Sequence, residues 1–358
     1  MIKPEIAMIV PVTGATPSQR LNLESLMRQK GASYQVIMVV ADRSDEALSV
    51  SEDLSQRYPH SRVVIAGKAE HCSQKNWNLI AGVQSVEGSV DVLVFCDSGH
   101  RAHDSWLSGL IKPITEGAMV SSGYHQVYSE KKGIFVNAQA VCVQFLSQIR
   151  KLPGCRQTWG GATAIRADCF DSLKVIELWS TNIVDDVSLS WLLSQHKIGI
   201  AIPDQPDLAT NLSNQSVTGL QKWLIRQWAY LKYIHPLLWL LTGLVSYLAS
   251  SLVCGSLLLA GSSVFFFWGS PLLFASGTVL LCFILFVSVL YKKHPEPGNL
   301  LHWYFASLIA LLLSTTSHLA SMIKNEIEWS GISYRVTMRG RVTMIIRPNS
   351  DMEITEKS

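Results

Sequence analysis

Residues 1 to about 210 alternate between short apolar runs and segments that carry apolar residues at helical spacing. Segments such as SQRLNLESLMRQ and SQKNWNLIAGVQSV repeat apolar positions every three or four residues. The runs between them contain almost no polar residues: EIAMIVPV, YQVIMVVAD, SRVVIAG and DVLVFCD. Uninterrupted apolar strands that alternate with helices are typical of a parallel sheet covered on both faces. We therefore predict an α/β fold for this part of the chain.

The rest of this part is less regular. AMVSSGYHQVYS, within residues 118–150, has the character of a strand. TWGGATAIRADCF places Gly160 and Gly161 before another strand-like run. The stretch that begins at VIELW predicts a polar turn with Asp185 and Asp186, then a helix and a strand.

The last third of the chain changes character. No Asp, Glu, Lys or Arg occurs between Lys232 and Lys292, and a further apolar stretch runs from Leu300 to Met322. About 20 helical residues cross a bilayer core. We expect four parts: an α/β domain over 1–217, an interfacial helix over 218–234, two to three membrane segments over 235–322 and a basic tail over 323–358.

The helix predicted over 218–234, TGLQKWLIRQWAYLKYI, is amphipathic. Leu220, Trp223, Leu224, Trp228 and Leu231 fall on one face, and Lys222 and Arg226 fall on the other. Trp and Tyr beside cations are typical of the headgroup level of a membrane. The alternative is an ordinary helix packed on the domain.

The two ends of the chain indicate which side of the membrane each part of the protein faces. The first apolar run is too short for a signal peptide, so we expect the first domain to face the cytoplasm, in an integral membrane protein. Three crossings would then place the tail outside, yet the tail is basic, and basic segments prefer the cytoplasm. One apolar stretch is therefore expected to be re-entrant or interfacial, and the breaks at Gly261 and Gly269-Ser270-Pro271 favour the 233–291 region.

The net charge and the cysteine content argue against several kinds of partner and site. The formal net charge is only +3, which gives no reason to expect a nucleic-acid partner. The seven cysteines form no CxxC pair, so neither a zinc site nor a disulfide framework is predicted. His71, His100 and His103 match no metal-ligand spacing, and His100 and His103 are expected at the solvent or the edge of a crevice.

Carboxylates follow several of the predicted strands. Asp42 and Asp97 come directly after apolar runs, and Lys75 lies on the helix between them. A single Asp at such a place is most often a cap or a turn former. Together with Asp185 and Asp186, however, they suggest a nucleotide site, because ligands bind beyond the carboxyl ends of parallel strands. One carboxylate would hold Mg²⁺ or Mn²⁺ on a diphosphate, and another would act as a general base.

Four of these stretches resemble the successive motifs of the family 2 glycosyltransferases: VVADRSDEA, VLVFCDSGHRAHDSWL, TWGGATAIRADCF and NIVDDVSLSWLLSQHKIGIA. The CDSG form, followed by apolar spans, is most similar to the ceramide glucosyltransferase branch, and the resemblance covers roughly residues 5–235. It implies a GT-A fold and inverting transfer of a sugar, with UDP-hexose as the expected donor, to a lipid hydroxyl.

The resemblance also implies roles for single residues. Asp42 would contact the nucleoside, and Asp97 the diphosphate and its Mn²⁺ or Mg²⁺ ion. Asp186 would be the catalytic base, and Asp185 occupies the position of the family's Glu. Lys75 is a candidate for neutralising the negative charge of the diphosphate. Gly160 and Gly161 would let the backbone approach the sugar.

Two departures from the family pattern matter. Many relatives carry Asp-x-Asp where this chain has Asp97-Ser98-Gly99, so a single carboxylate would hold the metal. On the interfacial helix the branch has Arg-Trp, and here Gln227 precedes Trp228. Either Arg226 or Gln227 then serves the same end of the site, or the contact with the acceptor differs from that of the branch.

Two other readings compete with a lipid glycosyltransferase. A processive polysaccharide synthase would use its spans as a channel, but this chain has few spans and no second cytoplasmic insertion. A catalytically silent membrane scaffold would keep the GT-A fold without turnover, since fold alone does not imply function. Retention of Asp42, Asp97 and Asp186 together favours an enzyme.

Overall fold

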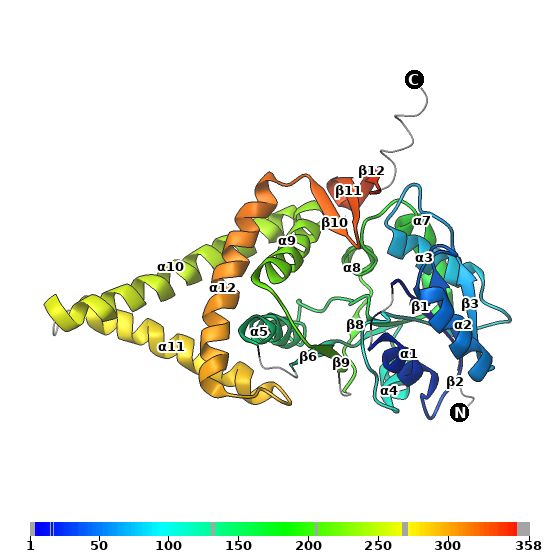
Figure 1. Cartoon of the computed structure of the whole chain (residues 1–358), viewed down its shortest axis with the longest axis horizontal. Coiled ribbons are helices and arrows are strands. Elements are labelled where there is room, and N and C mark those ends of the chain that lie inside the picture. The colour runs from blue at the N-terminus through cyan, green and yellow to red at the C-terminus, as the bar shows by residue number, and fades with distance from the viewer. Residues whose placement is uncertain are drawn as a thin grey trace, which may run out of the picture. The chain divides into compact units, whose positions relative to one another are not determined.

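The structure is a computed structural model, and it describes residues 4–14, 16, 18–129, 133–204, 207–266 and 271–348. The chain forms two compact units. Unit 1 comprises residues 1–125, 149–211 and 325–358, and unit 2 comprises residues 126–148 and 212–324. Figure 1 shows the elements of both units, coloured along the chain.

Unit 1 is built on a seven-stranded sheet with the order β3-β2-β1-β4-β7-β5-β8. All neighbours pair in parallel except β7, which runs antiparallel to β4 and to β5. The predicted parallel α/β fold is therefore confirmed, with one reversed strand that the pattern does not reveal. The strands are β1 (Glu5–Pro11), β2 (Ser33–Val40), β3 (Ser61–Ile65), β4 (Val92–Cys96), β5 (Val120–Ser122), β7 (Ala162–Arg166) and β8 (Ile200–Ala201).

Seven helices of unit 1 accompany this sheet: α1 (Gln19–Met27), α2 (Ala47–Arg57), α3 (Gln74–Gln84), α4 (Trp106–Thr115), α6 (Ala167–Ser172), α7 (Val175–Trp179) and α8 (Asp186–Gln195). Helices α1, α3 and α8 lie where the sequence predicts helices, whereas α2 was not expected.

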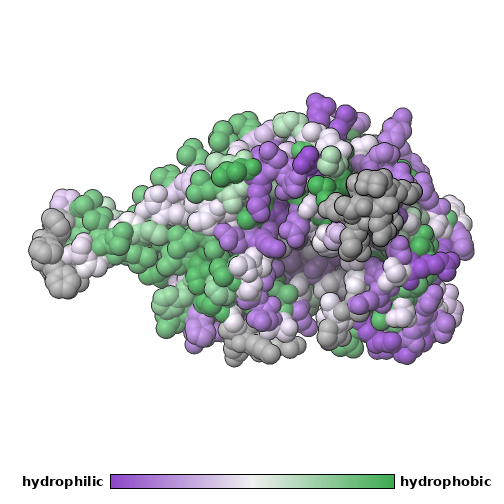
Figure 2. Space-filling model, turned by 45° about the horizontal axis from the view of Figure 1, so that its top comes forward, coloured by the Kyte–Doolittle hydropathy of each residue, from purple (hydrophilic) through white to green (hydrophobic). Residues whose placement is uncertain are grey.

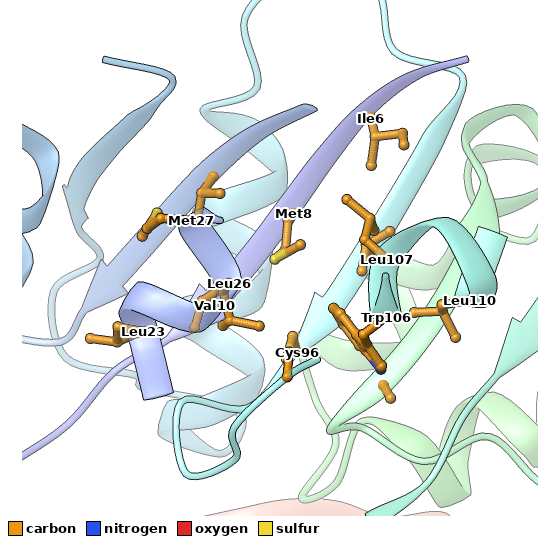
Figure 3. Packing of buried hydrophobic residues seen from close by; sticks show 14 of the residues in the cluster. Ile6, Met8, Val10, Leu23, Leu26, Met27, Cys96, Trp106, Leu107 and Leu110 are labelled. Carbon is orange, nitrogen blue, oxygen red and sulfur yellow. The ribbon is translucent and has the colours of Figure 1, made fainter. Parts of the chain in front are cut away.

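Both faces of the sheet are buried, which explains why its strands read as continuous apolar runs. In β1, Met8 and Val10 pack into one core and Ala7 and Ile9 into the other. Figure 3 shows the first core, where side chains of α1 and α4 such as Leu26, Trp106 and Leu107 meet Met8 and Val10 of β1. Side chains of α3, α7 and α8 contribute to the second core.

The segment expected as a basic tail is folded. It contains a three-stranded antiparallel sheet in which β10 and β12 flank β11. The strands are β10 (Glu326–Trp329), β11 (Ile332–Thr337) and β12 (Arg341–Ile346), with the short 3-10 turn η1 (Met338–Gly340) before the last. This sheet belongs to unit 1, although more than 100 residues of unit 2 precede it in the chain.

Unit 2 is helical. Its elements are α5 (Ile134–Ile149), α9 (Val217–Ile234), α10 (Pro236–Phe266), α11 (Pro271–Lys293) and α12 (Leu300–Ile323), and two short strands, β6 (His125–Ser129) and β9 (Leu208–Leu212), lie where the chain passes between units. Helices α10, α11 and α12 are long and apolar enough to cross a membrane. Figure 2 shows apolar residues gathered over these helices, whereas hydrophilic residues predominate on unit 1.

Candidate active site

A single lysine joins two of the predicted carboxylates. The Lys75 ammonium lies 2.7 Å from Asp97 Oδ1 and 3.2 Å from Asp185 Oδ2. The three groups come from different elements: the first turn of α3, the residue after β4 and the residue before α8. The Lys75 side chain is only 11% exposed, so this is an interior ion cluster at the carboxyl edge of β4.

The antiparallel strand β7 brings Gly160 to the same edge. Cys96, the last residue of β4, pairs with Ala162, and the chain therefore enters β7 beside Asp97. A Cβ atom on Gly160 would overlap the Asp185 carboxylate and lie 2.7 Å from Lys75 Nζ. The absence of a side chain at Gly160 thus makes room for the ion cluster. The expected approach of Gly160 and Gly161 to a sugar stays a prediction.

Asp186 differs from Asp185 in exposure and in partners. Asp185 is buried, whereas Asp186 is half-buried. The Asp186 carboxylate accepts hydrogen bonds from Gly160 N at 3.0 Å and from Val187 N at 2.6 Å. These bonds fix its direction at the positive end of α8.

Charge in the cluster is unevenly distributed. Burial opposes the charge on Lys75, but Asp185, Asp97 and Asp186 outweigh it and raise the Lys75 pKa, so the ammonium stays charged. Burial raises the pKa of Asp185 to about 7; Lys75 pulls it down, and Asp186 and Asp97 push it up. The cluster is thus a Lys75–Asp97 ion pair with a neighbouring carboxyl that takes up a proton near neutral pH.

Asp42 lies after β2, at the same edge of the parallel strands. Its Oδ1 accepts hydrogen bonds from Ser44 N and Ser44 Oγ, both at 2.9 Å. Both bonds lower the pKa of Asp42, and the bond from the Ser44 backbone has the larger effect. They form a turn in which Asp42 is held as a carboxylate.

Asn76, next to Lys75, holds the loop that leads to the two aspartates. Its side-chain amide donates to Asn182 O at 2.9 Å and to Trp179 O at 3.3 Å, and Asn76 is fully buried. The Trp179 indole donates in turn to Asp185 O at 3.1 Å. The helix that carries Lys75 and the loop that carries Asp185 are therefore fixed to each other.

The C-terminal sheet contacts both of these segments. The Tyr334 hydroxyl accepts a hydrogen bond from Gln74 N at 3.2 Å, and the Trp329 ring lies 5.7 Å from Lys75 Nζ. Asn182 Nδ2 donates a hydrogen bond to Arg339 O, and Ile183 N donates one to Gly340 O, each at 2.9 Å. These residues could not be predicted from the sequence, because no local motif indicates a contact between residues that are 150 or more positions apart.

Two histidines lie beside the cluster. His100 Nδ1 and His125 Nδ1 are 2.7 Å and 2.6 Å from Thr210 Oγ1, and the Trp159 ring stacks on His125. Burial lowers the pKa of His100 to about 4, so the ring is neutral at physiological pH. His100 is half-buried and His103 is exposed, as expected for residues at the edge of a crevice or at the solvent.

The proposed acceptor residues lie on α9 in unit 2. The Trp228 indole donates to Ser314 O of α12 at 3.0 Å, and its ring contacts His318 edge-on. Leu220 and Leu224 of the same predicted face are buried. Part of the face that was expected to meet lipid is therefore covered by protein. Arg226 and Gln227 are half-buried on the same helix.

The family model for glycosyl transferase family 21 matches residues 1–342. The chain belongs to glycosyl transferase family 21. The expectation of a glycosyltransferase is thereby confirmed, and the match is to family 21, the ceramide glucosyltransferase family, instead of family 2. The fold class is the expected one, an α/β domain with a mostly parallel sheet, and three apolar helices lie in the C-terminal part of the chain.

Several solved structures are distantly similar to this family 21 chain. A mannosyltransferase from Pyrobaculum calidifontis, in complex with GDP-Man and Mn²⁺, is 13% identical, with 88% of each chain covered and a TM-score of 0.44. Glucosyl-3-phosphoglycerate synthase from Mycobacterium tuberculosis is 15% identical, with 61% of this chain and 75% of that chain covered and a TM-score of 0.36. Likenesses of this size carry no information on substrate or mechanism.

Proposed function

We propose that this family 21 glycosyltransferase moves a hexose from a nucleoside diphosphate donor, UDP-hexose in the first instance, to the hydroxyl group of a membrane lipid, with inversion at the anomeric carbon. The observation that carries the proposal is the interior cluster in which Lys75 joins Asp97 to Asp185, with Asp186 held beside it by two backbone N–H groups. Three apolar helices in the same chain support a lipid acceptor.

On the donor side, Asp42 is proposed to contact the nucleoside and Asp97 the diphosphate. Lys75 offsets the charge of the carboxylates around it, so an anionic donor meets a less negative edge. Positive charge and oriented N–H groups stabilise a diphosphate as it leaves. Gly160 and Gly161 are proposed to let the backbone of this loop lie close to the sugar.

A divalent cation fits this donor side in one way only. Lys75 already occupies the gap between Asp97 and Asp185, and no group of three His, Cys, Asp or Glu side chains in the described residues could hold a metal ion. Asp97 is 31% exposed and would be the one protein ligand. Mg²⁺ is commonly held by one or two carboxylates together with substrate phosphates and water. Such an ion would neutralise diphosphate charge.

Asp186 is the proposed base. The lipid hydroxyl oxygen forms a bond to the anomeric carbon while the bond from that carbon to the diphosphate oxygen breaks. The hydroxyl proton passes to Asp186, and the nucleoside diphosphate leaves with the electron pair. Burial of Asp185 favours this choice, because only the half-buried Asp186 is open to an acceptor.

The acceptor is proposed to approach along α9, with Arg226, Gln227 and Trp228 near its hydroxyl group. The amphipathic pattern of α9 and its packing with α12 support a position at the bilayer surface. Unit 1 is proposed to face the cytoplasm, where nucleotide sugars are made available.

The test is a screen of purified protein in nanodiscs. Labelled UDP-glucose, UDP-galactose, UDP-N-acetylglucosamine and GDP-mannose are each offered with ceramide, diacylglycerol, a sterol or a total lipid extract, and products are separated by thin-layer chromatography. We expect one donor to label a lipid, and NMR coupling constants to show a β-linked sugar from an α-linked donor. Trp228→Ala in the same assay should reduce lipid labelling more than donor hydrolysis by water.

Two results would contradict the proposal. Labelled products of increasing chain length, insensitive to added lipid, would indicate a processive polysaccharide synthase. Tight binding of a nucleotide sugar with neither transfer nor hydrolysis would indicate a catalytically silent scaffold.

A further inference from the structure

Three helices could cross a membrane, but the folded C-terminal sheet restricts how many do. The chain leaves unit 1 after residue 211 and returns to it at residue 325. After its return, Gly340 O and Val342 N form hydrogen bonds of 2.9 Å with Ile183 N and Thr181 O. Parts that are hydrogen-bonded to each other lie on one side of a bilayer about 30 Å thick. The number of crossings between residues 211 and 325 is therefore even.

A second contact fixes the position of a residue within the segment from 211 to 325. His294, just after α11, is buried and donates from Nε2 to Val127 O at 3.1 Å. Val127 is two residues from His125, which is 2.6 Å from Thr210 in unit 1. Two residues span about 7 Å at most. Residue 294 therefore lies on the same side as unit 1, and α12 alone connects residue 294 to residue 325.

We infer that α12 lies along the membrane surface on the side of unit 1, and that α10 and α11 form a hairpin that crosses the bilayer and returns. Zero crossings by α12 and two by α10 and α11 satisfy both contacts. In Figure 1, α10 and α11 run together away from α12 as a hairpin, as this assignment requires. The sequence pattern had favoured the 233–291 region as the interfacial part.

The surface of α12 fits a helix with one face in lipid. Exposed apolar residues recur at spacings of four and seven along its whole length: Leu301, Phe305, Leu312, Leu319 and Ile323. The opposite face is buried in unit 2 and comprises Trp303, Ala306, Ser307, Ala310, Ser317, His318 and Ser321. The apolar stripe thus runs from end to end, and the bilayer is its proposed occupant.

Composition distinguishes α12 from the hairpin. It is the least apolar of the three helices and the one most buried inside the protein. Its last turn is tied to α9, because Lys232 Nζ donates to Ser321 O at 2.9 Å and to Met322 O at 3.1 Å. A lysine there satisfies free carbonyl groups at a helix end.

Spin-label depth measurements test the orientation of α12. Single labels at Leu301, Leu312 and Ile323 are placed in full-length protein in liposomes, after replacement of the seven native cysteines. We expect all three labels at one shallow depth, roughly 5–10 Å below the headgroups. A crossing helix would place Leu312 about 16 Å deeper than its ends, at 1.5 Å per residue. That result would overturn the inference.

Labels on α11 are the matched control. Leu272, Leu281 and Val289 are exposed on this helix, and Leu281 should be far deeper than the other two. Equal, shallow depths along α11 would also overturn the inference, because the hairpin would then not cross.

A second measurement keeps the native cysteines. Protease-sensitive tags are placed at the N-terminus, after Pro297 and at the C-terminus, and sealed vesicles of both orientations are treated with protease. We expect the three tags to be cut in the same vesicles. Cutting of the C-terminal tag only in the opposite vesicles would mean that α12 crosses, and the inference would be wrong.

Discussion

At the scale of single residues, one lysine organises the candidate site. Lys75 neutralises charge between Asp97 and Asp185, and Gly160 leaves the space in which they meet. Removing one partner of a buried ion pair commonly costs about 3–5 kcal/mol, because a charge is left uncompensated. The residues of this cluster are therefore expected to affect stability and activity together, and each variant needs a control that separates the two.

Gly160→Ala tests the packing of the cluster. The new methyl group would overlap the Asp185 carboxylate and approach Lys75, so we expect loss of transfer by at least about 100-fold and a lower melting temperature. Gly199→Ala is the matched control, because nothing lies within 4 Å of a Cβ atom there. Normal activity in Gly160→Ala would show that the ion cluster tolerates separation.

Asp185→Asn tests the raised pKa of Asp185. The pKa of about 7 lies above the value of an unfolded chain, so protonation favours the folded state. That stabilisation is complete below about pH 4 and is lost as the pH rises through 7. Asn resembles the protonated form, so the melting temperature of the variant relative to wild type should rise between pH 5 and pH 8. A constant or falling difference would mean that Asp185 is ionised throughout.

Asp97→Asn tests the proposed cation. With one carboxylate as the protein ligand, Mn²⁺ should bind weakly to the protein alone and more tightly when UDP or GDP supplies phosphate oxygens. Electron paramagnetic resonance of free Mn²⁺ measures both. We expect Asp97→Asn to reduce the nucleotide-dependent binding about 10-fold or more. Tight binding to the wild type without nucleotide would place the ion at a different set of ligands.

At the scale of elements, the C-terminal sheet is the part that ties the site together from outside the GT-A motifs. Tyr334 accepts a hydrogen bond at the first turn of α3, and η1 accepts two from the loop before Asp185. Arg339 has a left-handed backbone, with φ of 64°, which is uncommon for a residue other than glycine. The sheet thus supports both segments that contribute charged groups to the cluster.

Tyr334→Phe tests this support. The loss of one buried hydrogen-bond acceptor should lower the free energy of unfolding by about 1 kcal/mol and reduce kcat more than it raises the KM of the donor. Tyr58→Phe is the control, because its hydroxyl accepts from Arg28 at an exposed position. Unchanged kcat in a stably folded Tyr334→Phe protein would limit the sheet to a role in stability.

The central strands of the parallel sheet were largely predictable, because strands such as β1 and β4 are buried on both faces and therefore form continuous apolar runs. Asp97 could be placed at the edge of the sheet because it follows an apolar strand, whereas Lys75 of α3 and Asp185 before α8 meet it only in the folded structure. The reversed direction of β7, which brings Gly160 to the site, could not be predicted, because a short apolar run does not indicate the direction of its strand. The C-terminal sheet was also missed, because its strands are stabilised by contacts with residues far away in the sequence.

At the scale of the whole molecule, two units share one chain in an interleaved order. Unit 1 carries the ion cluster, and unit 2 carries the apolar helices, while the last segment returns to unit 1. Membership in glycosyl transferase family 21 accounts for the sugar-transfer chemistry of the first unit. The chain leaves unit 1 after residue 211 and returns to it at residue 325, so both ends of the apolar segment are covalently continuous with the unit that carries the ion cluster.

The most direct test of the central claim is the rate of sugar transfer by wild-type protein and by Asp186→Asn, with the donor and lipid identified in the screen. We predict that Asp186→Asn binds the donor with nearly unchanged affinity and transfers it roughly 10² to 10⁴ times more slowly, since a general base contributes that factor. Transfer at the wild-type rate by Asp186→Asn would contradict the account.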